Sequence, residues 1–245
     1  MLKQRVIPVL FLMDGKIVRS ERFNVFKVIG DPYQELARFD EWDADELVYL
    51  DISRQHGGID MKMLGKIADC AFMPLAFGGN IVSADQAVDM IRGGADKIVI
   101  NTAAHENPGL IEEIALKLGS QAVTVAIDCA QNSIWTHHGT RQRKETACEW
   151  ARIVEARGAG EILLNSIERD GTGIGYDLES IEKVAKSVRI PVVACGGVGK
   201  FEHFVEGFGA GADAVAAGNI FHFTENAYPR AKRYLHDKGI PVRCE

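Results

Sequence analysis

The residues best suited to chemistry in this sequence are aspartates that directly follow apolar runs. Asp128 ends the run at 123–127, which carries no charge, so its carboxyl group could serve as a general acid or base. Asp51 ends a similar run, and Asp170 begins a turn-like segment. Each aspartate has a structural alternative, because aspartates also cap loops and turns. Acid–base chemistry is therefore predicted only if the fold brings such residues to one place.

Two glycine-rich turns have the composition of anion sites. A turn without side chains lets backbone N–H groups approach a phosphate, and a helix that begins there adds to the attraction. A third loop, at 170–171, could close over a ligand. The predicted phosphate-binding residues are Gly79, Asn80, Asn101, Thr102, Asp170, Gly171, Gly197, Gly218 and Asn219. The alternative is tight turn chemistry with no ligand.

The two turns belong to a repeat that covers the whole chain. Gly-Ala-Asp occurs at 94–96 and again at 211–213, and the paired glycines Gly78 and Gly196 are 118 positions apart in a chain of 245 residues. A repeat of that length predicts a duplicated half-domain, with halves at about 1–120 and 121–245. Equivalent anion sites in symmetric halves indicate a substrate with a phosphate at each end.

Eight short apolar runs separated by helical patterns must position these residues. The runs lie at 6–11, 47–51, 73–77, 97–100, 122–128, 162–165, 192–195 and 214–217, and the helical patterns at 83–92, 108–118, 145–157, 178–187 and 201–208. Near-continuous apolar runs are typical of parallel strands buried on both faces. A small hairpin is predicted at 133–140. The order predicts an α/β protein, a single (β/α)8 TIM barrel over 1–245, whose chemistry lies at the strand C-termini; that rule also nominates Asn165.

Four charges open apolar runs at the opposite end of the predicted barrel. Arg5, Glu46, Lys97 and Glu161 precede the first, second, fourth and sixth strands. If the barrel closes, they meet at its N-terminal mouth and neutralise one another. From spacing alone, a solvated stability face is favoured over a gate to a central passage.

Composition narrows the classes of function. A formal charge of −6 argues against a nucleic-acid partner, and no apolar run approaches the roughly 18 residues of a membrane span. The chain begins without a signal-peptide pattern. The five cysteines include no Cys-x-x-Cys, and the seven histidines show no metal-ligand spacing. We therefore expect a cytoplasmic protein with reduced thiols, no metal, no cofactor and no membrane partner.

The whole chain resembles the cyclase subunit of imidazole glycerol phosphate synthase, the HisF family. The resemblance rests on the stretches 5–8, 14–15, 30–32, 45–52, 94–97, 100–104, 119–123, 157–164, 169–172 and 199–204. It implies that a HisH-like glutaminase docks at the N-terminal face, which it meets at Asp96. It further implies that ammonia passes a gate formed by Arg5, Glu46, Lys97 and Glu161 and travels to a phosphorylated ligand at the other end. The resemblance thus raises the gate interpretation above the solvated face.

The sequence departs from the family where the chemistry is done. The family uses aspartates at the ends of strands one and five; the second corresponds to Asp128, but the first corresponds to Phe11. A phenyl ring cannot carry a proton. Asp14 corresponds to a separate loop aspartate. In the flexible loop after strand one Arg19 replaces a lysine, and Asn80 replaces the third glycine of the first phosphate turn.

A retained gate beside a lost carboxylate resembles a diverged branch of the family, in which the barrel passes ammonia to a sugar amidotransferase in lipopolysaccharide biosynthesis. The first hypothesis is therefore a cyclase-like subunit of a glutamine amidotransferase complex that receives and conducts ammonia. One alternative is a working cyclase, a lyase of histidine biosynthesis, which Phe11 disfavours. The other is a non-catalytic scaffold that only docks the glutaminase, which the phosphate turns disfavour.

Overall fold

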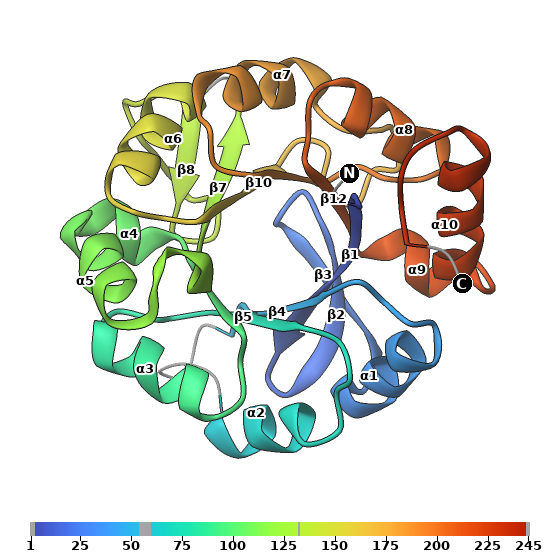
Figure 1. The fold of residues 1–245 in the computed structure, drawn as a ribbon, viewed down its shortest axis with the longest axis horizontal. Helices are drawn as coiled ribbons and strands as arrows, with labels where there is room; N and C mark the ends of the chain where they lie inside the picture. Colours follow the sequence, from blue (N-terminus) through green and yellow to red (C-terminus); the bar gives the residue numbers. More distant parts are fainter. Residues whose placement is uncertain (1–2, 54–59, 132, 244–245) are drawn as a thin grey trace.

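The computed structural model describes residues 3–53, 60–131 and 133–243 and shows a closed barrel of eight parallel strands (Figure 1). In order around the barrel they are β1 (Arg5–Met13), β4 (Leu47–Asp51), β5 (Leu75–Gly78), β6 (Lys97–Ile100), β7 (Val123–Ala130), β10 (Glu161–Ser166), β11 (Val192–Cys195) and β12 (Ala214–Ala217). β12 pairs with β1 through Arg5↔Ala214, which closes the sheet. The predicted TIM barrel is confirmed.

Helices form an outer ring around the strands (Figure 1). They are α1 (Pro32–Glu41), α2 (Met61–Ala68), α3 (Ala84–Arg92), α4 (Thr102–Glu106), α5 (Gly109–Leu118), α6 (Ala147–Ala156), α7 (Leu178–Ser187), α8 (Glu202–Gly209), α9 (Asn219–Phe223) and α10 (Ala227–Asp237), with a 3-10 turn at Ser120–Ala122. Local signals fix several starts. Ser83 caps α3 by accepting a hydrogen bond from the Gln86 N–H at 3.2 Å, and Thr146 forms a capping box with Glu149 at α6.

Two antiparallel hairpins extend from the C-terminal ends of β1 and β7. β2 (Lys16–Glu21) and β3 (Val25–Gly30) follow β1, and β8 (Ser133–Thr136) and β9 (Arg141–Gln142) follow β7. The second hairpin was predicted. The first was not predicted, because this segment was described only as a loop after strand one. β3 is exposed or half-buried along its whole length, so it leaves no buried run in the sequence.

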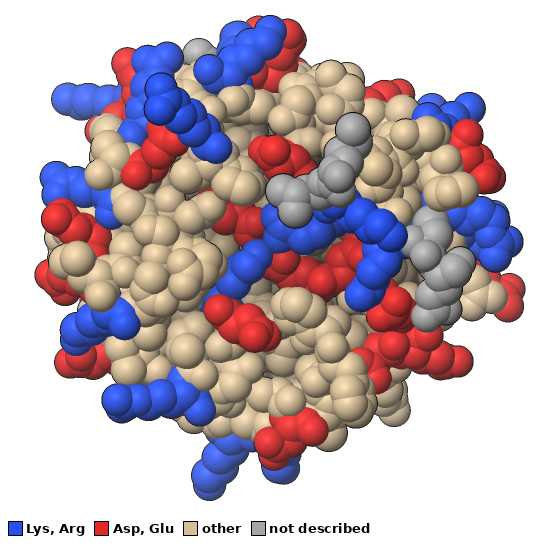
Figure 2. Space-filling model, viewed as in Figure 1, with Lys and Arg blue, Asp and Glu red and all other residues tan. Residues whose placement is uncertain are grey.

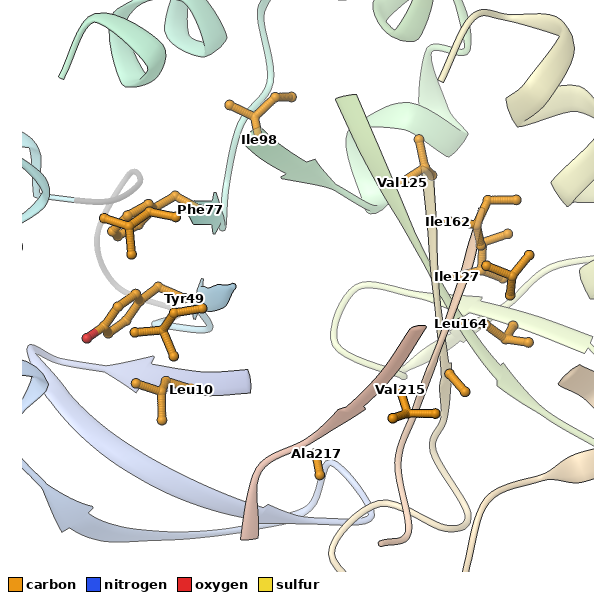
Figure 3. Close-up of a cluster of buried hydrophobic side chains, with 14 of the residues drawn as sticks. Leu10, Tyr49, Phe77, Ile98, Val125, Ile127, Ile162, Leu164, Val215 and Ala217 are labelled. Atoms are coloured by element: carbon orange, nitrogen blue, oxygen red, sulfur yellow. The ribbon is translucent and has the colours of Figure 1, made fainter. Parts of the chain in front are cut away.

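The barrel strands bury side chains on both faces. Residues facing the helices form the larger core, of which Leu10, Tyr49, Phe77, Ile98 and Val125 are examples (Figure 3). The alternate positions fill the barrel interior with Ile7, Val9, Val48, Ala76, Val99, Ala126, Leu163, Val193, Cys195, Ala214 and Ala216. This two-sided burial is why the strand sequences read as apolar runs rather than as alternating patterns.

Within the described residues, no helix is both long and apolar enough to cross a membrane, and no cluster of histidine, cysteine, aspartate and glutamate could hold a metal ion. The cysteines described there are free: Cys70, Cys129, Cys148 and Cys195. Cys244, which shared the prediction of reduced thiols, lies outside the described residues.

Candidate active site and charged ring

A cavity of about 230 Å³ lies at the C-terminal ends of the barrel strands. Asn101, Asp128 and Asn165 give it one polar wall. The opposite side is apolar and is made by β1, β4 and the first hairpin, through Phe11, Met13, Phe23, Phe26, Leu50 and Ile52. The interior residues Val99 and Ala126 also line it, so the cavity continues into the barrel.

Asp128, near the end of β7, has its carboxylate held by two amide groups. Asn101 Nδ2 donates to Oδ2 at 2.7 Å, and Asn165 Nδ2 donates to Oδ1 at 3.4 Å. Burial raises the pKa of Asp128 to about 7, against the two hydrogen bonds, which lower it. A carboxyl group that titrates near neutrality can either donate or accept a proton at physiological pH. The geometry therefore suits a general acid or base.

Asn165 brings an unused acceptor to the same site. Its side chain is buried, and its Oδ1 has no hydrogen-bond partner among the described residues. A buried acceptor left unpaired costs roughly 1–3 kcal/mol, so a donor from a ligand or water is favoured there. Sequence reasoning nominated this residue by position but gave it no role.

Phe11 takes the strand-one position that would face the cavity with a second acid. It pairs in register with Leu50 and packs against the interior core. Asp51, the other candidate acid, lines the cavity, but its Oδ1 accepts a hydrogen bond from the Ser53 N–H at 2.8 Å. That contact gives Asp51 the capping role that was its structural alternative.

The first predicted phosphate turn lies at the cavity, since Gly79, Asn80, Asn101 and Thr102 all line it. Gly79 has a φ of +125°, and a Cβ there would clash with the Asp51 carbonyl oxygen. Asn80 also has a positive φ, of 50°, and its Nδ2 donates to the Ser53 carbonyl at 3.3 Å. The glycine is thus required by packing whether or not an anion binds, and phosphate binding here stays a prediction.

The residues of the second predicted phosphate turn do not line this cavity; they are Gly197, Gly218 and Asn219. A Cβ at Gly197, where φ is +103°, would clash with the Gly175 carbonyl oxygen, and a Cβ at Gly218 would lie 3.0 Å from the Val9 carbonyl oxygen. Asn219 Nδ2 donates to the Ser20 carbonyl of the first hairpin at 3.3 Å. These residues therefore sit where the hairpin and a neighbouring loop meet the barrel.

Asp170 and Gly171 hold the tip of the same hairpin. The Ser20 hydroxyl donates to Asp170 Oδ2 at 2.6 Å, and the Phe23 N–H donates to it at 3.4 Å. Burial raises the pKa of Asp170. A Cβ at Gly171 would clash with the Ser20 carbonyl oxygen. This loop thus contacts the hairpin, whose Ser20 and Phe23 line the cavity, and its closure over a ligand stays a prediction.

The four charges at the other end of the barrel form a closed ring. Arg5 bridges Glu46 and Glu161, the latter at 2.6 Å, and Lys97 Nζ bridges the same two carboxylates at 2.9 Å each. Figure 2 shows basic and acidic side chains meeting at the centre of the barrel end that faces the viewer. The structure therefore brings together all four residues that the sequence singled out.

In the ring, burial and the neighbouring opposite charges shift the pKa values in opposite directions. The carboxylate side chains of Glu46 and Glu161 are only 5% and 8% exposed, whereas a solvated face would leave them open. Burial alone would lower the pKa of Arg5, but the two glutamates raise it overall. Burial alone would raise the pKa of Glu161, but Arg5 and Lys97 lower it overall. Both shifts favour the charged forms of Arg5 and Glu161. The ring holds two basic and two acidic side chains, so their formal charges cancel.

Asp96 is exposed at the same end of the barrel, in the loop before β6. Its Oδ2 accepts a hydrogen bond from the Leu75 N–H at 2.8 Å. Asp213, its counterpart in the sequence repeat, accepts from the Val192 N–H at 2.9 Å. Asp96 thus has a structural role that Asp213 shares, beside the partner contact predicted for it.

Sequence reasoning missed the hairpin residues Ser20 and Phe23 and the interior residue Thr124. The hairpin had one overlooked signal, the Asp14-Gly15 turn between β1 and β2, where both residues have a positive φ. The turn between β2 and β3, which carries Phe23, has no such motif. Thr124 had a signal, because it is the polar member of the otherwise apolar run before Asp128.

Comparison with known proteins gives the family. Residues 5–227 match the family described as "Histidine biosynthesis protein". The chain belongs to this family. Among its relatives, the imidazole glycerol phosphate synthase subunit HisF of Gluconacetobacter diazotrophicus is 42% identical over 99% of this chain and 97% of that protein. HisF of Pyrococcus furiosus is 43% identical over all of both chains. HisF of Chlorobium phaeovibrioides is 44% identical over 99% of this chain and all of that protein.

These relatives confirm the resemblance to the HisF family. This member of the histidine biosynthesis protein family is similar to cyclase subunits from end to end. The sugar-amidation branch stays a proposal.

Proposed function

We propose that this chain is the barrel subunit of a glutamine amidotransferase. In the proposal it receives ammonia from a HisH-like glutaminase at its N-terminal face and conducts it through the barrel to the cavity at Asp128. The observation that carries the proposal is the buried ring of Arg5, Glu46, Lys97 and Glu161. Buried ion pairs are often no more stabilising than apolar residues, so a sealed ring over a barrel mouth favours a role other than stability.

The interior beyond the ring suits a neutral molecule. Val48, Val99, Ala126 and Leu163 line it with apolar surface. Burying an unpaired ammonium ion among such residues is costly, whereas uncharged ammonia loses only its hydrogen bonds to water. The passage thus favours ammonia over its protonated form.

Asp128 is the residue we propose to handle protons where the ammonia arrives. This role is supported by burial, which raises the pKa of Asp128 to about 7, and by the two amide groups that hold its carboxylate in place. Phe11 stands where the family pattern has its strand-one aspartate, so we expect weak cyclase turnover by the chain itself. A phosphorylated small molecule remains the proposed ligand, held at one end by Gly79, Asn80, Asn101 and Thr102.

For the ammonia acceptor, we propose a sugar substrate handled by a separate sugar amidotransferase. This proposal is supported by a contrast: the chain keeps the charged ring, but it has Phe11 in place of the strand-one carboxylate. The second candidate function is an authentic cyclase of histidine biosynthesis. It is favoured by the retained Asp128 and by relatives that are 42–44% identical over nearly the whole chain.

Reconstitution with a HisH-like glutaminase tests the proposal. We expect the chain to bind the glutaminase and to reduce escape of ammonia into solution. Arg5→Ala or Lys97→Ala leaves two buried glutamates underbalanced and should increase that escape. Lys183→Ala, which removes an exposed helical ion pair with Glu179, is the control. Absence of glutaminase binding, or equal ammonia escape in all variants, would support the solvated-face interpretation instead.

A further inference from the structure

Thr124 places a hydroxyl group inside the barrel, between the ring and the cavity. Its register partners are Val99 on β6 and Glu161 on β10, which face the interior core and the ring. Ala126 and Asp128 follow it on the same face of β7. Thr124 therefore lies on the path that the proposed function requires.

The hydroxyl of Thr124 is buried without a partner. The residue is 4% exposed, and Oγ1 has no hydrogen-bond partner among the described residues. Buried polar groups in folded proteins are nearly always paired with protein or with ordered water. A group that finds no protein partner therefore points to a bound molecule.

The side chains around Thr124 are smaller than those that usually fill a barrel interior. Barrel interiors are usually filled by bulky branched side chains. Here the interior core includes Ala76, Ala126, Ala214 and Ala216, and Ala126 is the next residue on the same face of the strand. Small side chains at these positions reduce the packing along the barrel axis.

We propose that Thr124 Oγ1 binds one small uncharged polar molecule inside the barrel. Water occupies the site in the resting protein, and ammonia occupies it in transit. A hydroxyl can donate to the lone pair of either molecule and can accept one of its hydrogens. The ammonia part rests on the proposed function; the water part does not.

Thermal unfolding of Thr124→Val and Thr124→Ser tests the site without any assay of activity. If the hydroxyl holds a molecule, the isosteric Thr124→Val variant loses that partner and its Tm does not rise. If the hydroxyl is unpaired, the same change removes a buried polar group and should raise Tm by about 2 °C or more. Thr136→Val is the control, because Thr136 Oγ1 already accepts from Arg143 Nε at 2.9 Å and its loss should lower Tm.

Crystal structures of the isolated subunit distinguish water from an amine. In ammonia-free buffer we expect one solvent peak within about 3.2 Å of Thr124 Oγ1, present in wild type and Thr124→Ser and absent in Thr124→Val. Crystals soaked in methylamine at alkaline pH should show an elongated peak at the same place. No peak in wild type, together with a raised Tm in Thr124→Val, overturns the site. A water peak that methylamine never replaces overturns the amine part. Neither result depends on glutaminase binding, so failure of the proposed function is recognised separately.

Discussion

At the scale of single residues, the cavity brings together Asp128, whose pKa is raised to about 7, and Phe11, whose phenyl group cannot carry a proton. Asp128 could be found from the sequence because it ends an uncharged run, and Phe11 could be found only by comparison with the family pattern. What the sequence could not show is that Asn101, predicted to bind phosphate, donates to Asp128. That contact depends on the lateral register of β6 and β7, which no local pattern encodes.

Phe11→Asp should increase ammonium-driven cyclase turnover. A positioned acid–base group typically contributes about 10²–10⁴-fold, so we expect a gain of at least about 10²-fold over a weak wild-type rate. The measurement is conversion of the formimino-ribulosyl bisphosphate intermediate with excess ammonium. Phe26→Asp, which adds a carboxylate elsewhere on the cavity wall, is the control. Wild-type turnover as fast as that of HisF relatives would show that another group replaces the missing acid.

Asp128→Asn should stabilise the protein at alkaline pH but not at acid pH. Because the pKa of Asp128 is raised in the folded state, ionisation opposes folding; the penalty is absent below about pH 4 and complete above about pH 7. Raising a pKa from roughly 4 to 7 corresponds to at most about 4 kcal/mol. Urea unfolding at pH 4.5 and pH 8 compares the variant with wild type. If the free energy of unfolding differs between variant and wild type by the same amount at both pH values, ionisation of Asp128 does not destabilise the folded protein.

At the scale of elements, the eight barrel strands could be predicted because burial on both faces makes their sequences continuously apolar. β5 begins at Leu75 rather than at the predicted residue 73, and β1 extends to Met13 because β2 pairs with its end. Helices α1 and α2 were not predicted, although each begins after an aspartate cap that the sequence shows, Asp31 and Asp60. The first hairpin escaped because β3 is exposed or half-buried and because tertiary contacts hold the hairpin in place, among them those of Ser20 with Asp170 and Asn219.

Asp96→Ala and Asp213→Ala should separate structure from partner binding. Asp96 accepts a hydrogen bond from the N–H of Leu75, the first residue of β5, and Asp213 accepts one from the N–H of Val192, the first residue of β11. Loss of either hydrogen bond should therefore cost roughly 1–3 kcal/mol of folding stability. Only Asp96→Ala should also weaken binding of a HisH-like glutaminase. The measurements are thermal unfolding and titration calorimetry. Equal weakening by both variants would assign the effect to the barrel rather than to an Asp96 contact.

At the scale of the whole molecule, the two ends of the barrel differ in their side chains. One end carries the ring of two basic and two acidic side chains. The other end carries the cavity with the carboxyl group of Asp128. The sequence predicted both ends in outline: the cavity end from the glycine turns that recur in each half, and the charged end from the four charges that open apolar runs. It did not predict that only one of the two glycine turns lines this cavity, since the first hairpin meets the barrel at Asn219 and the loop at Asp170.

Asn80→Gly should strengthen anion binding at the first turn. Asn80 already has a positive φ, so glycine fits without strain and removes a side chain from the approach to the backbone N–H groups. We expect a several-fold lower Kd for inorganic phosphate, measured by calorimetry. Asn226→Gly, at another positive φ before α10, is the control and should change nothing. An unchanged Kd would place the anion away from this turn.

The most direct test of the account is the ratio of glutamine-driven to ammonium-driven turnover in the complex with a HisH-like glutaminase. Residual cyclase turnover serves as the reporter. Wild type and Lys183→Ala should give the same ratio, whereas Arg5→Ala and Lys97→Ala should lower it several-fold while the ammonium-driven rate is kept. A lower ratio in both ring variants is the result the conduit predicts. A ratio identical in all four proteins would contradict it.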